Sequence, residues 1–255
     1  MNSLEVPRSS TPAQLERQLR IDLAACYRLV AHYGLDDQLA THISVRVPGN
    51  DCRFLINPYG MMFSEITASN LVLVNGNGDL LSDAPSGVNP AGVNIHAAIH
   101  EVRSTPLCVL HLHGNAGVAV SALQCGLLPI SQTAMAVYHD VAYHDYEGFA
   151  TQRQEREHLQ RDIGDKGILI LRNHGTLVSA PSVAEAFSRA TVLEKACEIQ
   201  LKAMATGHKL VEATADAIDT TYKAAMSPTY AGHLRELLWP SLLKMLDRTD
   251  SSYRD

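Results

Sequence analysis

Short apolar runs rich in β-branched residues alternate with segments of helical periodicity along this chain, and that alternation limits the fold more than any other feature. Residues 43–47, 52–57 and 71–75 read ISVRV, CRFLIN and LVLVN, with the turn-forming sequences PGN, PYG and NGNGD beside them. These are typical of short strands joined by tight turns. We therefore expect an antiparallel meander here.

The middle of the chain changes period several times. We expect helices at 92–103, 115–124 and 151–164, and strands at 108–114, 141–146, 167–173 and 176–180. Helices interleaved with strands of both kinds predict a single α/β layered domain.

Capping signals mark two longer helices. Thr11, Pro12 and Gln14 form a capping box that opens a helix with Gly34 as its natural end, and Ser182 with Glu185 opens a second that ends near Gly207. A further amphipathic pattern, roughly 218–247, contains the single tryptophan. We divide the chain into a flexible leader (1–10), the main domain (11–210) and a C-terminal helical tail (211–255).

Composition excludes several classes of partner. The formal charge is -6 and Lys and Arg are scattered, so neither nucleic acid nor an anionic membrane is an expected partner. No stretch approaches the roughly 18–20 apolar residues of a bilayer span, and the first ten residues lack an apolar core, so we expect a cytoplasmic protein. The five cysteines include no CxxC spacing, and we interpret them as reduced packing residues.

Three histidines are the strongest candidates for chemistry. His111 and His113 are two residues apart on an expected strand, so their side chains share one face. His174 follows another apolar strand, in a turn where Gly175 permits tight backbone geometry. Three imidazoles with an open position suit a catalytic divalent metal.

The other histidines are less specific. His96 is either a core residue or a partner of the metal ligands, and His139 and His144 flank a segment in which Tyr143 and Glu147 could transfer protons. We interpret five others as structural: His32, His42, His158, His208 and His233.

The segments GVNIHAAIH, VLHLHG, LLPIS, VAYHDYEG and LILRNHGTLVS resemble the class II aldolase/adducin family in order and spacing, over roughly 20–210. The likeness is greatest to the adducin head domain and its bacterial relatives. It implies a three-layer α/β/α sandwich around a largely antiparallel sheet, assembled as a homotetramer. It also implies zinc binding by His111, His113 and His174.

The sequence departs from the sugar-phosphate aldolases of that family at specific positions. Their acid/base glutamate falls at Gly92, and their phosphate-binding pairs fall at 41–42 and 90–91, which here read Thr-His and Pro-Ala. Only the turn at 58–60 keeps the family's P-x-G pattern. We therefore expect an unphosphorylated substrate.

These observations favour a metal-dependent lyase acting on a small carbonyl substrate, with Zn²⁺ as the metal and Tyr143 or Glu147 as proton-transfer groups. One alternative is an Fe²⁺-dependent oxygenase acting on a 2-oxo or 2-hydroxy acid, because a three-histidine face leaves positions open for such a ligand and dioxygen. The other is a non-catalytic adducin-like interaction module.

Overall fold

The computed structural model describes residues 11–255 except 50, 85, 104–106 and 151, so the expected leader at 1–10 lies outside the described residues. Within the described part, seven strands form one sheet in the order β3-β2-β1-β4-β7-β6-β5. The strands are β1 His42–Arg46, β2 Arg53–Ile56, β3 Val72–Asn75, β4 Cys108–Leu112, β5 Val141–His144, β6 Ile168–Leu171 and β7 Gly175–Ala180. Of these neighbours, β5 and β6 are parallel and the others antiparallel. The expected meander is β1-β2-β3.

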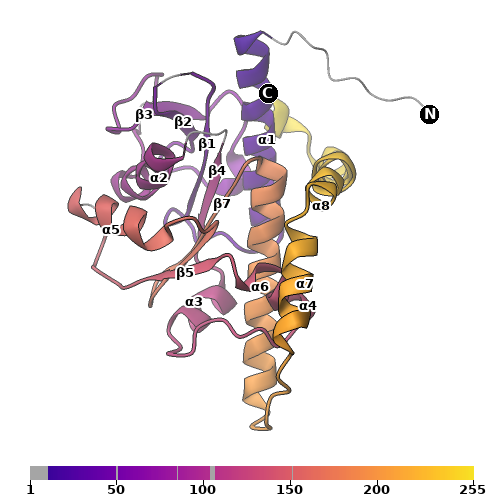
Figure 1. Ribbon diagram of the computed structural model, residues 1–255. Coiled ribbons are helices and arrows are strands. Elements are labelled where there is room, and N and C mark those ends of the chain that lie inside the picture. Colours follow the sequence, from indigo (N-terminus) through magenta and orange to yellow (C-terminus); the bar gives the residue numbers. More distant parts are fainter. Residues whose placement is uncertain (1–10, 50, 85, 104–106, 151) are drawn as a thin grey trace.

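Helices cover both faces of the sheet (Figure 1). Alternate residues of each strand face opposite layers, as Ile168 and Ile170 pack in one core cluster and Leu169 and Leu171 in another. The first face is covered by α1 (Pro12–His32), α3 (Asn115–Ser121), α4 (Gln132–Tyr138), α6 (Val183–Ala205) and α9 (Trp239–Thr249). The second is covered by α2 (Pro90–Val102) and α5 (Gln154–Ile163). The expected three-layer α/β/α sandwich is confirmed.

The capping signals fix the starts of both long helices. Thr11 and Gln14 form the reciprocal capping box of α1, and the Ser182 hydroxyl accepts from the backbone N–H of Glu185 at the start of α6. The short helix α4, between the loop at 127–131 and β5, was not expected from the sequence.

The C-terminal region packs on the main domain. It comprises α7 (Ala215–Ala225), α8 (Pro228–His233), a π-helical segment at Leu234–Leu238, and α9. The indole N–H of Trp239 donates to the Asp22 carboxylate of α1 at 2.9 Å, and the Trp239 side chain is buried. No helix in the described ranges is both long and apolar enough to cross a bilayer.

A group of polar side chains lies between the sheet and α2. His42 on β1 pairs in register with His111 on β4, so the two side chains share a face. Ser44 lies on that same face, and His96 and His100 descend onto it from α2. The candidate site lies where His42 and His111 of this group line a cavity.

Candidate metal centre

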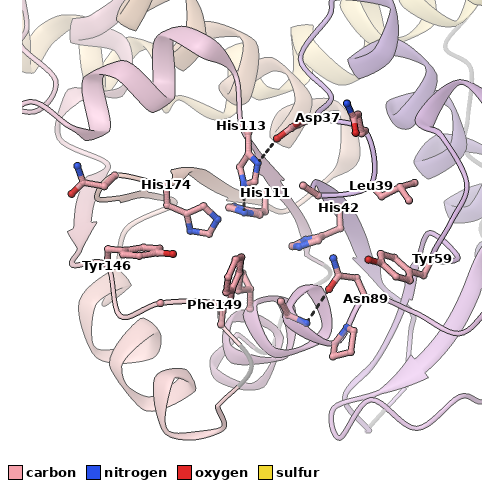
Figure 2. A pocket seen from close by; sticks show the side chains of 18 residues that line it. Asp37, Leu39, His42, Tyr59, Asn89, His111, His113, Tyr146, Phe149 and His174 are labelled. Carbon is pink, nitrogen blue, oxygen red and sulfur yellow. Dashed lines mark hydrogen bonds and ion pairs between the residues drawn. The ribbon is translucent and has the colours of Figure 1, made fainter.

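The three expected ligands converge. His111 is on β4, His113 directly follows it, and His174 lies in the turn between β6 and β7. One ring nitrogen from each lies within 4.8 Å of the other two. In Figure 2 the three imidazoles face one another at one end of a cavity.

The backbone at 173–175 makes this convergence possible. Asn173 has a φ of 56°, which turns the chain sharply before His174. A Cβ on Gly175 would lie 2.6 Å from the carbonyl oxygen of Leu112 and 2.8 Å from the His113 ring. Only glycine allows β7 to approach the end of β4 this closely, so Gly175 holds the turn against the histidine pair.

In His111 and in His113, a hydrogen bond at Nδ1 fixes the tautomer of the ring. The Nδ1–H of His113 donates to the Asp37 carboxylate at 2.9 Å, and the Nδ1–H of His111 donates to the carbonyl oxygen of Thr176 at 3.2 Å. A carboxylate and a carbonyl oxygen accept hydrogen bonds and do not donate them. Both imidazoles therefore carry the proton on Nδ1 and have a lone pair on Nε2.

These two Nε2 atoms lie close together. The Nε2 atoms of His111 and His113 are 3.0 Å apart, too close for two acceptors with nothing between or beside them. A cation bound by both nitrogens removes that repulsion, and metal-binding histidines characteristically hold a carboxylate or carbonyl on the other nitrogen. The donor set fits a divalent metal.

Burial keeps His111 and His174 unprotonated. It lowers the pKa of His111 well below its usual value, with further lowering by neighbouring imidazoles. Burial, with His113 and His144 nearby, lowers the pKa of His174 to about 4. Neutral imidazole is the form that binds metal, so these two ligands are ready to bind a metal at neutral pH.

The cavity beside the histidines has a volume of about 620 Å³. Tyr146 and Phe149 face the histidines across it, and Asn89 and Tyr59 lie at the far end (Figure 2). Among the residues that the structure describes, the lining includes no lysine or arginine, and its single carboxylate is that of Asp37, already bonded to His113. The cavity is large enough for a small substrate and offers a bound anion no fixed positive side chain.

Tyr143 and Glu147, the expected proton-transfer groups, do not line this cavity. The Tyr143 hydroxyl accepts from the backbone N–H of Leu127, and its ring stacks under the Arg172 guanidinium. Glu147 accepts hydrogen bonds from His158. The tyrosine that faces the ligands is Tyr146, whose ring centre is 6.0 Å from that of His174.

Sequence reasoning missed two residues of the site. Asp37 follows α1 in a loop with no motif to mark it. His42, which we interpreted as structural, lines the cavity with its ring centre 5.0 Å from that of His111. A Cβ on Gly92 would lie 2.7 Å from the His42 ring, so His42 occupies the space that a side chain at position 92 would need. The pairing of histidine at 42 with glycine at 92 was the available signal.

The remaining candidates have structural partners. His139 is half exposed and bonds to Asp219 of α7. His144 is buried and bonds to Asp162 of α5. His96 is on α2 and bonds to His42, so it supports a cavity residue without lining the cavity.

Comparison with known proteins gives consistent matches. Residues 21–201 match the family described as Class II Aldolase and Adducin N-terminal domain. An aldolase II superfamily protein from Pseudomonas syringae is 45% identical, with a TM-score of 0.88 over 97% of this chain and 98% of that one. An L-fuculose 1-phosphate aldolase from Glaciozyma antarctica is 28% identical, with a TM-score of 0.85 over 98% and 96%. Alpha-adducin of Mus musculus is 44% identical over 194 residues, which are 75% of this chain and 26% of the adducin.

Proposed function

Since the chain belongs to the class II aldolase and adducin family, we propose that it is a metal-dependent carbon–carbon lyase acting on a small, unphosphorylated carbonyl substrate. His111, His113 and His174 would hold the metal, with Zn²⁺ as the proposed ion. One observation carries this proposal. The Nε2 atoms of His111 and His113 are 3.0 Å apart, and each has a lone pair because the Nδ1–H of the same ring donates a hydrogen bond elsewhere.

A divalent ion on three neutral ligands would keep its full charge and supply Lewis acidity to a carbonyl oxygen. The protein's own part is to position that carbonyl. Tyr146 and Phe149 line the cavity opposite the histidines and offer apolar surface against which a substrate would pack. His42 and Asn89 offer polar atoms at the cavity wall.

The start of α2 supports an unphosphorylated substrate. Helix N-termini bind phosphate through free backbone N–H groups. Here Pro90 has none, and the N–H groups of Ala91 and Gly92 both donate to the Asn89 side chain, at 3.1 and 3.5 Å. The groups that would hold a phosphate dianion are thus absent or already engaged.

The test combines metal analysis with a substrate screen. Protein purified without oxygen is expected to contain about one divalent ion per chain and to cleave or condense unphosphorylated carbonyl compounds without consuming dioxygen. Oxygen uptake with a 2-oxo or 2-hydroxy acid would instead establish the Fe²⁺-dependent oxygenase. Metal-free protein that remains inactive after addition of Zn²⁺ or Fe²⁺ would overturn both enzymes.

The similarity to alpha-adducin favours one further candidate, a non-catalytic interaction module. A scaffold has no need for three imidazoles converging on one point, and that convergence is why we propose the enzyme first. The assembly into a homotetramer and the cytoplasmic location are also proposals.

A further inference from the structure

A continuous chain of buried hydrogen bonds runs between the sheet and α2, from the cavity wall to His100 in the last turn of the helix. His42 Nδ1 is 2.8 Å from His96 Nε2, His96 Nδ1 contacts the Ser44 hydroxyl, and that hydroxyl is 2.7 Å from His100 Nε2. All four side chains are buried. We call these four residues, His42, His96, Ser44 and His100, the histidine relay.

Two of the relay imidazoles, His96 and His100, are neutral at pH 7. Burial lowers the pKa of His96 well below the usual range, and lowers that of His100 to about 3. A neutral imidazole has one N–H donor and one lone pair. The relay can therefore run in either of two directions, and the direction decides which nitrogen of His42 carries the proton.

The end of the relay sets its direction. His100 Nδ1 is buried and has no hydrogen-bond partner among the described residues. A buried N–H without a partner is rarer and more costly than a buried lone pair without one. His100 therefore has its lone pair on Nδ1 and donates from Nε2 to the Ser44 hydroxyl.

The remaining protons follow from that choice. Ser44 has a single O–H, which must then donate to His96 Nδ1. His96 is left with its proton on Nε2 and donates to His42 Nδ1. His42 consequently carries its own proton on Nε2, the nitrogen that no described residue binds, and its ring projects into the cavity beside His111 (Figure 2).

We propose that the relay fixes His42 as an Nε2–H donor beside the metal ligands, and that this donor selects 2-oxo acids by binding their carboxylate. The proposal rests on the proposed function and narrows its substrate class. A carboxylate offers only acceptors, which matches a fixed donor. Its negative charge would also balance the positive charge of a metal held by three neutral ligands, in a cavity whose described lining residues include no lysine or arginine.

The direct test is the tautomer of His42 in zinc-loaded protein. Nuclear magnetic resonance of ¹⁵N-histidine-labelled protein separates protonated from unprotonated ring nitrogens, and the His42 signals are assigned by their loss in His42→Phe. We expect protonated Nε2 and unprotonated Nδ1. A proton on Nδ1 of His42 would overturn the proposal, and this measurement does not depend on any activity.

The functional test uses oxalate, a dianion with the oxygen arrangement of a 2-oxo acid. His42→Phe should keep its zinc and bind oxalate about 10- to 100-fold more weakly, because it loses one hydrogen bond to a charged group. His42→Gln, whose amide can donate from a similar position, should recover part of the affinity, and His139→Phe should behave as the parent protein.

The two proposals fail separately. Unchanged oxalate affinity in zinc-replete His42→Phe would overturn the role of His42 and leave the lyase intact. Parent protein with the expected tautomer and His42-dependent oxalate binding, but without carbon–carbon cleavage of any 2-oxo acid, would overturn the lyase and leave the donor role intact.

Discussion

A histidine binds a metal through a nitrogen that carries no proton, and the contact made by the opposite nitrogen determines which nitrogen that is. In this protein Asp37 and the Thr176 carbonyl make that decision for His113 and His111. These hydrogen bonds do not require a bound metal. The residues around the ligands therefore set the orientation and tautomer of the ligand imidazoles.

His113→Ala is expected to remove most of the bound metal while leaving the fold. The residue follows β4 at the cavity edge, with 16% of its side chain exposed, so its loss leaves the core packing unchanged. Metal analysis and circular dichroism measure both effects. His139→Ala, at a half-exposed histidine bonded to Asp219, is the matched control. Full metal content in His113→Ala would contradict the ligand assignment.

Asp37→Asn tests the partner of the ligand. An amide oxygen still accepts from His113 but carries no charge, so the imidazole becomes a weaker ligand and is held less firmly. We expect metal affinity to fall about 10- to 100-fold, measured by competition with a chelator. The neighbouring Asp36→Asn should leave the affinity unchanged. Equal affinities in the two variants would show that Asp37 does not support the site.

The sequence indicated the ligands and not their partners, for a physical reason. HxH on a strand and NHG in a turn are local patterns whose geometry follows from spacing alone. Asp37 and His42 reach the site through strand pairing and the path of a loop after α1, which no local pattern records. Tyr143 and Glu147 were suggested by proximity in sequence to the VAYHDYEG motif, and the structure places both outside the cavity.

At the scale of elements, α2 carries the clearest prediction about substrate choice. Asn89 caps the helix and occupies the N–H groups of Ala91 and Gly92. Losing two or three charge-assisted contacts to a phosphate costs about 3–6 kcal/mol, so sugar phosphates should have kcat/KM values roughly two to four powers of ten below those of unphosphorylated carbonyl acids.

The measurement compares fuculose, ribulose and rhamnulose phosphates with their unphosphorylated forms and with simple 2-oxo acids, at equal metal loading. A sugar phosphate that proved the best substrate by tenfold or more would mean that another segment binds the phosphate. The 28% identical structure of an L-fuculose 1-phosphate aldolase makes this comparison informative, because the two chains share a fold over nearly their whole length.

Elements with strong local signals were predictable from the sequence, and those that depend on packing were less so. The capped helices α1 and α6 begin where Thr11 and Ser182 indicated. Helix α4, with seven residues, is too short to be stable alone, and packs through Ala134 and Val137 into the main core. The parallel pairing of β5 with β6 likewise follows from how α5 connects them, which periodicity does not reveal.

At the scale of the whole molecule, the C-terminal tail needs no second chain to cover Trp239. Trp239, Leu242 and Leu246 are buried within the chain itself. Other large apolar side chains remain exposed. Phe149 is 86% exposed at the cavity rim, and Leu237 is 63% exposed on the π-helical segment.

These exposed groups still favour association of several copies. Phe149 and Tyr146 lie at the mouth of the cavity, where a neighbouring subunit that covered them would also shield bound substrate from water.

Together with the family resemblance, this predicts a homotetramer. Light scattering at micromolar concentration should give about four times 27.8 kDa. Phe149→Ser should weaken the assembly if the rim is an interface. Val211→Ser, at an equally exposed residue that does not line the cavity, should leave the mass unchanged. A parent protein that scatters as a monomer of 27.8 kDa would refute the tetramer and would leave the cavity to be closed by this chain alone.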